Sequence, residues 1–219
     1  MLSLKDNPPV KSPTIESLGG VQGDWFVAHT KSRNEKAFAW DLLRQNVPHF
    51  LPMVQRVTFS GGRKRRSLAA LFPGYVFFAG DGETRSQAMA TGRLCQVIPV
   101  PDQTRLVGEL TQIDAVLATG HDLEYFPHAS VGQHVRVTAG PYEGTEGTVI
   151  EHAPPNEAGE VVIVLGVSIL GVGAAIRVPP SLITTADAPV EVAPKTTVKY
   201  ERVDPPAREQ RGRPLPPGK

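Results

Sequence analysis

The spacing of hydrophobic residues divides the 219-residue chain into two patterned regions. Between residues 25 and 117, short runs rich in aromatic and β-branched residues alternate with stretches in which apolar residues recur every three or four positions. The short runs are typical of β-strands and the longer stretches of amphipathic helices. In chain order the pattern predicts a strand over 25–30, a helix over 31–45, strands over 50–59 and 75–78, a helix over 83–91, a strand over 94–98 and a helix over 104–117.

The order of these elements indicates how they pack. The helix over 104–117 places Leu106, Leu110 and Ile113 on one face, with Leu117 beside them, and such a stripe needs an apolar surface to cover it. Strands and helices in this order are typical of an antiparallel sheet with helices packed on it. We therefore expect an α+β fold for this region.

Beyond residue 128 the period of the apolar residues changes to two. Five short runs separated by glycine and proline fit into about 55 residues, which is the size of a small SH3-like β-barrel. Within it, the glycines of Gly140–Gly147 are expected to permit positive φ angles or close approach of strands. This interpretation leaves Tyr142 as the exposed side chain of the turn, and the acidic neighbours Glu143 and Glu146 favour a protein partner over nucleic acid.

Composition indicates where the two patterned regions begin and end. Residues 1–22 mix proline, glycine and polar residues and are expected to form a disordered leader, while residues 185–219 contain 7 prolines and are expected to form a disordered tail. The sequence thus predicts an N-terminal domain over 23–119, a linker over 120–128 and a barrel over 129–184.

Charge distinguishes the two regions, although the net charge of the chain is only +1. Residues 24–120 carry 12 basic and 8 acidic side chains, whereas residues 128–184 carry 2 basic and 5 acidic ones. The N-terminal region is therefore the better candidate for facing nucleic acid.

Cysteine content and hydropathy bear on the compartment. Cys95 is the single cysteine and cannot form an internal disulfide, which favours a reducing cytoplasm. No apolar run approaches the roughly 18–20 residues of a membrane span, and Met1–Gly20 lacks the pattern of a secretory signal. We expect a cytoplasmic protein without membrane contact.

Catalytic and metal sites find no support in the sequence. The six histidines are dispersed, and none is paired with a cysteine or a second histidine at ligand spacing. Gly166–Gly171 lacks the lysine and hydroxyl residue of a phosphate loop. Cys95 lies in an apolar strand, as expected for a packed thiol. We expect no metal, no cofactor and no enzymatic activity.

Two segments of the N-terminal region are candidates for binding. The run Arg63, Lys64, Arg65 and Arg66 follows a glycine turn, and it is read either as a solvated basic hairpin or as a site for phosphates. In the strand from Tyr75, alternation places Tyr75 and Phe77 on one face and the next aromatic on the other. The pattern leaves open whether that face is core or a pocket for a partner.

The order of the motifs resembles transcription elongation factors of the NusG type. The N-terminal resemblance rests on Trp25–Thr30, Glu35, Leu51-Pro-Met53, the basic hairpin and Leu71-Phe-Pro-Gly-Tyr75. Gly132–Val137, Gly140-Pro-Tyr142 and Gly147-Thr-Val149 resemble the KOW motif of the C-terminal domain in those factors. Together these motifs cover residues 24–184.

The resemblance implies a monomeric protein whose N-terminal (NGN) domain binds the clamp helices of RNA polymerase and raises processivity. By position, it implies polymerase contacts from Trp25, Phe26, Tyr75 and Phe77. It also implies that the basic hairpin lies near upstream DNA or the non-template strand and makes weak backbone contacts.

The resemblance further implies a partner for the KOW domain, Rho or a ribosomal protein, with Tyr142, Ile169 and Leu170 as the contacting residues. Housekeeping members often have phenylalanine followed by Gly-Arg where this chain has Leu170-Gly-Val172, and Leu43–Val47 looks more like specialised RfaH-type or polysaccharide-operon antiterminators. We therefore expect a specialised antiterminator. The alternatives are a general NusG factor and a ribosome-associated KOW protein; the acidic balance of 128–184 argues against the latter.

Overall fold

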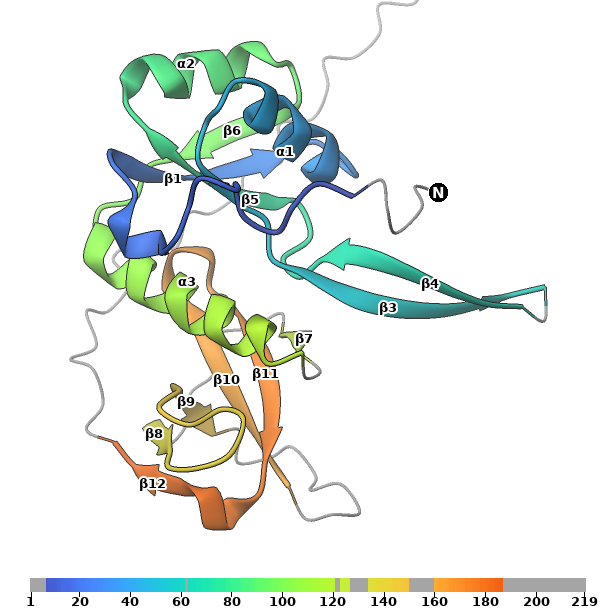
Figure 1. Cartoon of the computed structure of the whole chain (residues 1–219), viewed down its shortest axis with the longest axis vertical. Helices are drawn as coiled ribbons and strands as arrows, with labels where there is room; N and C mark the ends of the chain where they lie inside the picture. The colour runs from blue at the N-terminus through green and yellow to red at the C-terminus, as the bar shows by residue number, and fades with distance from the viewer. Residues whose placement is uncertain (1–6, 62, 121–122, 127–133, 150–159, 187–219) are drawn as a thin grey trace, which may run out of the picture. The chain divides into compact units, whose positions relative to one another are not determined.

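The computed structural model describes residues 7–61, 63–120, 123–126, 134–149 and 160–186. Its N-terminal part contains a four-stranded antiparallel sheet with the strand order β2-β5-β1-β6 (Figure 1). The strands are β1 (Asp24–Thr30), β2 (His49–Phe50), β5 (Tyr75–Gly80) and β6 (Leu94–Ile98), and the helices are α1 (Glu35–Arg44), α2 (Gly82–Ala90) and α3 (Gln103–Ala118).

Both faces of this sheet are covered by helices. Apolar residues of α1 and α2 pack with Ala28, Val76 and Phe78 on one face. Leucine and isoleucine side chains of α3 pack with Val27 and Phe77 on the other. The α+β prediction is confirmed. The last two helices begin at aspartate caps, since Asp81 and Asp102 accept hydrogen bonds from backbone N–H groups in the first turn of α2 and α3.

Residues 7–22 differ from the disordered leader that the sequence predicts. Leu18, in a short 3-10 helix (Leu18–Gly20), is only 2% exposed, and Ile15 is also buried. Lys11 forms an ion pair of 2.7 Å with Asp114 of α3, and Ser12 lies 2.8 Å from the imidazole of His49. This segment therefore completes the core on the α3 face of the sheet.

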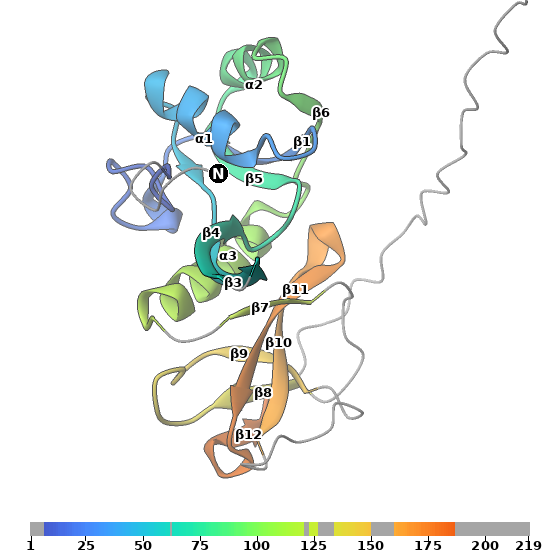
Figure 2. The same cartoon turned by 90° about the vertical axis from the view of Figure 1, so that its right-hand side faces the viewer.

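A separate two-stranded hairpin, β3 (Met53–Ser60) and β4 (Arg63–Ala70), extends away from the sheet in Figure 1 and points toward the viewer in Figure 2. The sequence predicts one strand over 50–59, but the chain divides at Leu51-Pro52 into β2 and β3. Proline cannot donate a ladder hydrogen bond; its carbonyl instead accepts one of 2.8 Å from the N–H of Leu71 and closes the base of the hairpin. Lys36 donates a 2.6 Å bond to the carbonyl of Leu68 and ties this base to α1.

The C-terminal part is a small all-β region, as predicted. Its six-stranded antiparallel sheet has the order β12-β8-β9-β10-β11-β7. The strands are β7 (Glu124–Phe126), β8 (His134–Val137), β9 (Glu146–Val149), β10 (Val161–Val167), β11 (Val172–Val178) and β12 (Ile183–Thr185), with 3-10 turns at Ser168–Leu170 and Pro180–Leu182.

The structure changes one predicted boundary of this region. The segment 120–128 was expected to be a linker, but it contains β7, which pairs with β11 and so belongs to the C-terminal sheet. The predicted start of the barrel at residue 129 and the expected tail beyond residue 186 lie outside the described residues.

Gly147 shows why β9 needs glycine. A Cβ at Gly147 would lie 2.6 Å from both the Ile163 side chain and the carbonyl oxygen of Val164 in the neighbouring strand. Only a residue without a side chain fits that approach. The prediction that a glycine here permits close contact between strands is confirmed.

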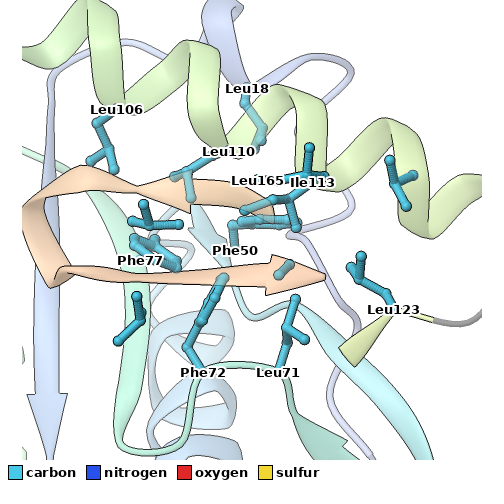
Figure 3. Packing of buried hydrophobic residues seen from close by; sticks show 14 of the residues in the cluster. Leu18, Phe50, Leu71, Phe72, Phe77, Leu106, Leu110, Ile113, Leu123 and Leu165 are labelled. Atoms are coloured by element: carbon cyan, nitrogen blue, oxygen red, sulfur yellow. The ribbon is translucent and has the colours of Figure 1, made fainter. Parts of the chain in front are cut away.

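The C-terminal sheet and α3 share one hydrophobic cluster. Figure 3 shows Leu110 and Ile113 of α3 beside Leu165 of β10, with Phe50 and Phe77 in the same cluster. Polar contacts accompany it: the N–H of Ser168 donates a 3.1 Å bond to Glu109, and the N–H of Glu146 donates a 3.0 Å bond to Gln112. In this structure the α3 face is therefore covered by α3 together with the β10–β11 hairpin.

Candidate binding surfaces

The turn Leu71–Tyr75 positions the first candidate surface. Pro73 and Gly74 occupy its centre, Gly74 has φ +86°, and the N–H of Tyr75 donates to the carbonyl of Phe72. Proline followed by a residue with positive φ is typical of a type II turn. The sequence Phe-Pro-Gly-Tyr therefore sets the local geometry.

Hydrogen bonds hold this turn against its neighbours. The Gly74 N–H donates a 2.8 Å bond to the Glu35 carboxylate at the start of α1. The Gly74 carbonyl accepts a 2.8 Å bond from the N–H of Thr30 at the end of β1. Tyr75 thus starts β5 from a fixed position.

Tyr75 is half-buried and stacks on His29, which pairs with it across the strands. The ring centroids are 5.1 Å apart and the planes are inclined by 24°. Since both rings are partly open to solvent, the pair offers a flat surface with an apolar body and polar tips. His29 belongs to this surface although no local pattern in the sequence marks it, because its place opposite Tyr75 follows only from the strand register.

The four aromatic residues expected to bind polymerase do not form one patch. Trp25 is 2% exposed and Phe77 has no exposed surface. Phe26 is half-buried, but it stacks on Phe78, with ring centroids 5.4 Å apart, on the face covered by α1. Because neighbouring strand residues point to opposite faces, Trp25 and Phe26 cannot share a surface. Only Tyr75 of the four lies on the α3 face with part of its ring accessible.

Phe77 is a core residue in this structure. Its ring lies 6.1 Å from that of Phe72, edge to face, and 6.3 Å from that of Phe50. Of the two interpretations that the sequence left open for this strand, core packing therefore describes Phe77 and partial exposure describes Tyr75.

The basic hairpin is the second candidate surface. Arg63, Lys64, Arg65 and Arg66 are exposed at the start of β4, next to the turn at Gly61, as the sequence predicts. Among the residues that the structure describes, none of these four side chains has a hydrogen-bond or ion-pair partner. Four unpaired cations in one strand repel one another, and an anionic ligand would relieve that repulsion.

The expected KOW contact residues are separated. Tyr142 was expected to be exposed but is only 9% exposed, and it lines a hollow of about 570 Å³ beside Val162 and Arg177. Ile169 and Leu170 are half-buried at the opposite end of the β10–β11 hairpin, roughly 16 Å away along the strands. The turn glycines fold Tyr142 back onto the sheet, so the interpretation of Tyr142 as an exposed contact is wrong.

Ionisable groups near α1 have structural partners. Burial raises the pKa of the Asp41 carboxyl, but hydrogen bonds from Arg93 and Arg44 outweigh burial and hold that pKa below its ordinary value. Burial lowers the pKa of the Lys36 ammonium, against a smaller opposite effect of Glu35. These groups link α1 to its neighbours. Within the described ranges, no group of three His, Cys, Asp or Glu side chains is arranged to hold a metal ion.

The length and hydropathy of the helices bear on whether the chain could span a membrane. No helix within the described part of the chain has the length and apolar character needed to cross a bilayer.

The N-terminal part is similar to a known protein family. Residues 23–116 match the profile of the family described as "Transcription termination factor nusG". The matched span runs from the residue before β1 into the last turn of α3, so the similarity to this family extends over the four-stranded sheet, its helices and the hairpin. No curated protein shows significant sequence similarity to the chain.

Two solved structures illustrate what the chain is similar to in fold comparisons. "Domain interaction in Thermotoga maritima NusG" has 20% identity and a TM-score of 0.42, covering 75% of this chain and 97% of that one. "Crystal Structure of MjSpt4:Spt5 complex conformation B" has 16% identity and a TM-score of 0.22, with the same coverage of each chain.

Proposed function

We propose that this protein is a non-catalytic transcription elongation factor that binds RNA polymerase through its N-terminal domain. The observation that carries the proposal is the family match over residues 23–116, which coincides with the sheet, its helices and the hairpin. The NusG-type domain is the polymerase-binding part of the factors that this chain resembles, and the proposed contact is the clamp helices of the polymerase.

The Tyr75–His29 pair is the proposed centre of the contact. It is the accessible aromatic group on the α3 face, and the turn at Gly74 holds it in place before any partner arrives. An aromatic side chain that is already ordered loses little conformational entropy on binding. Phe77 and Trp25 are buried, so they contribute by packing in the core under the strands and do not contact the partner themselves.

The proposed effect is a shift between states of the polymerase. A factor that binds the elongating state more tightly than the paused state shifts the population toward elongation, without any chemical step of its own. A preference of about 1.4 kcal/mol is enough for a tenfold shift. A small surface is therefore sufficient for a large effect on pausing.

The finer proposal is that the protein acts as an antiterminator at particular operons. It rests on Leu170-Gly171-Val172, which stands where housekeeping members often carry phenylalanine followed by Gly-Arg. Here Leu170 and Ile169 are half-buried against the hydrophobic cluster that includes α3. A general factor that couples polymerase to Rho or the ribosome is the alternative.

Transcription with purified polymerase tests the coarse proposal. Addition of the protein should reduce pausing or increase readthrough, and no change on any template would contradict it. Mapping of the protein along the genome tests the finer one. Occupancy at a few operons supports the antiterminator, whereas occupancy of most transcribed genes supports the general factor.

A further inference from the structure

Arg33, between β1 and α1, has a backbone conformation that a residue with a side chain rarely adopts. It is the third residue of the turn Lys31–Asn34, which a 3.0 Å hydrogen bond from the N–H of Asn34 to the carbonyl of Lys31 closes. Its φ of +61° lies in the left-handed region, where a Cβ is strained. Glycine or asparagine is the usual residue at such a position. The arginine therefore makes the fold less stable than glycine would.

Asn46 shows the contrast. It is the only other non-glycine residue with a positive φ in the described part of the chain, and it follows the C-terminal end of α1 with φ +54°. Asparagine is common after the last residue of a helix, because its short polar side chain tolerates the left-handed conformation. Asn46 thus follows a local preference, and Arg33 does not.

Hydrogen bonds within and beside the turn fix the conformation of Arg33. The N–H of Lys31 donates a 2.8 Å bond to the carbonyl of Arg93. The side-chain amide of Asn34 donates a 3.1 Å bond to the carbonyl of Ser32 and accepts one of 3.3 Å from the guanidinium of Arg93. A strained conformation persists where the surrounding contacts determine it. The turn therefore holds the arginine at a defined place.

That place is the edge of the aromatic surface. Both ends of the turn are attached to Gly74, the residue before Tyr75: the N–H of Thr30 donates a 2.8 Å bond to the Gly74 carbonyl, and the Gly74 N–H donates one of 2.8 Å to the Glu35 carboxylate. Arg33 is two residues from Glu35, at most about 7 Å along the chain. The cation therefore lies beside the surface that includes Tyr75.

Arg33 has no counterion of its own. Its side chain is exposed and has no hydrogen-bond or ion-pair partner among the residues that the structure describes. Both carboxylates of α1 are engaged, because Glu35 accepts a backbone hydrogen bond and Asp41 pairs with Arg44 and Arg93. An anion for Arg33 therefore comes from another molecule.

The neighbouring cations indicate which kind of anion fits. The ammonium groups of Lys31 and Lys36 each donate a 2.6 Å bond to a backbone carbonyl. The guanidinium groups of Arg44 and Arg93 pair with Asp41. A nucleic-acid backbone is held by several cations that meet successive phosphates. One unpaired guanidinium instead matches one carboxylate, which it binds through two parallel hydrogen bonds.

We propose that Arg33 binds a carboxylate of the protein partner that covers the Tyr75–His29 pair. The contact rests on the proposed function, in which that partner is RNA polymerase. It selects a partner with an acidic residue beside the site of the aromatic rings, and such a charge at the edge of an interface mainly raises the rate of association. The strained turn keeps the cation at that edge.

Arg33→Gly tests the contact, because it removes the cation and the strain together. The variant should raise the melting temperature of the full chain by roughly 4–8 °C. It should weaken binding to purified core RNA polymerase about tenfold at about 50 mM salt. At about 500 mM salt its affinity should approach that of the wild type, because salt screens an exposed ion pair. Weaker binding by a more stable protein is not a folding defect.

Two matched variants separate the charge from the backbone conformation. Arg33→Lys keeps a cation and a Cβ but loses the paired hydrogen bonds. Its melting temperature should equal that of the wild type, and its affinity should lie between those of the wild type and Arg33→Gly. Asn46→Gly changes the other residue with positive φ and should leave the affinity for polymerase unchanged.

Four results would overturn the proposal. Arg33→Gly could bind polymerase like the wild type, could lose the same factor at both salt concentrations, or could melt at a lower temperature than the wild type. A loss that occurs only when polymerase carries a DNA–RNA scaffold would assign Arg33 to nucleic acid. Absence of wild-type binding would refute the proposed function and this contact together, whereas wild-type binding with an unchanged Arg33→Gly affinity would refute the contact alone.

Discussion

Truncation of Tyr75 and of Phe77 to alanine separates a contact residue from a supporting residue. Phe77 is fully buried between Phe50 and Phe72. Removal of a buried phenylalanine ring costs about 3–5 kcal/mol, which lowers the melting temperature by roughly 12–40 °C in a domain of about 100 residues. Tyr75 is half-buried and stacks on His29, so Tyr75→Ala should cost about 1 kcal/mol.

Polymerase binding should show the opposite order of effects at a temperature where both variants are folded. If Tyr75 is the centre of the contact, its truncation should weaken binding about 30-fold or more, as expected for a residue contributing at least about 2 kcal/mol. Phe77→Ala should weaken binding less than Tyr75→Ala.

Thermal unfolding and a titration against labelled polymerase measure the two quantities on the same samples. Tyr75→Phe keeps the ring and serves as the control. Its melting temperature should equal that of the wild type, and its affinity for polymerase should lie within about threefold of the wild-type value. Unchanged affinity of Tyr75→Ala, together with a folded protein, would refute the assignment of this surface.

Three further predictions concern stability. Gly74→Ala should cost about 1–3 kcal/mol in urea unfolding, because φ +86° is strained for any residue with a Cβ; an unchanged midpoint would show that the turn relaxes. Gly147→Ala should destabilise the C-terminal sheet more than Gly144→Ala. A Cβ at Gly147 would clash with the neighbouring strand, whereas a Cβ at Gly144 has no atom within 4 Å and meets only the strain of φ +81°. Burial lowers the pKa of His49, so the unfolded chain binds its proton at higher pH than the folded protein. This group therefore leaves stability unchanged above about pH 6.5 and reduces it as the pH falls further; His49→Gln should flatten that fall, and an identical pH profile would contradict the reasoning.

The alternation of side chains made part of the fold predictable. The separation of Tyr75 and Phe77 from Phe78 follows from the two-residue period of a strand, and the structure places Phe77 and Phe78 in different hydrophobic clusters. The helix over 104–117 was likewise found from its stripe, to within one residue at each end of α3. These features depend on local sequence alone.

Features that depend on distant segments were not predictable. Ile15 and Leu18 are two apolar residues in a segment rich in proline and glycine, and nothing local reveals that α3 and the sheet leave room for them. The burial of Tyr142 was unpredictable for a similar reason, because Val162 of β10 and Arg177 of β11, which lie beside it, are distant in the sequence.

The exposed Phe59 had no local signal either. Phe59 continues the same alternation as the core strands, and only the separation of the hairpin from the sheet leaves it uncovered.

Photo-crosslinking from position 75 tests the central claim most directly. A benzoylphenylalanine in place of Tyr75 should form an adduct with the largest polymerase subunits at the clamp helices. The same group at Met89, which is exposed on α2 across the sheet from α3, should form none. Polymerase that co-purifies with the protein but crosslinks only from position 89, or from neither position, would contradict the proposed surface.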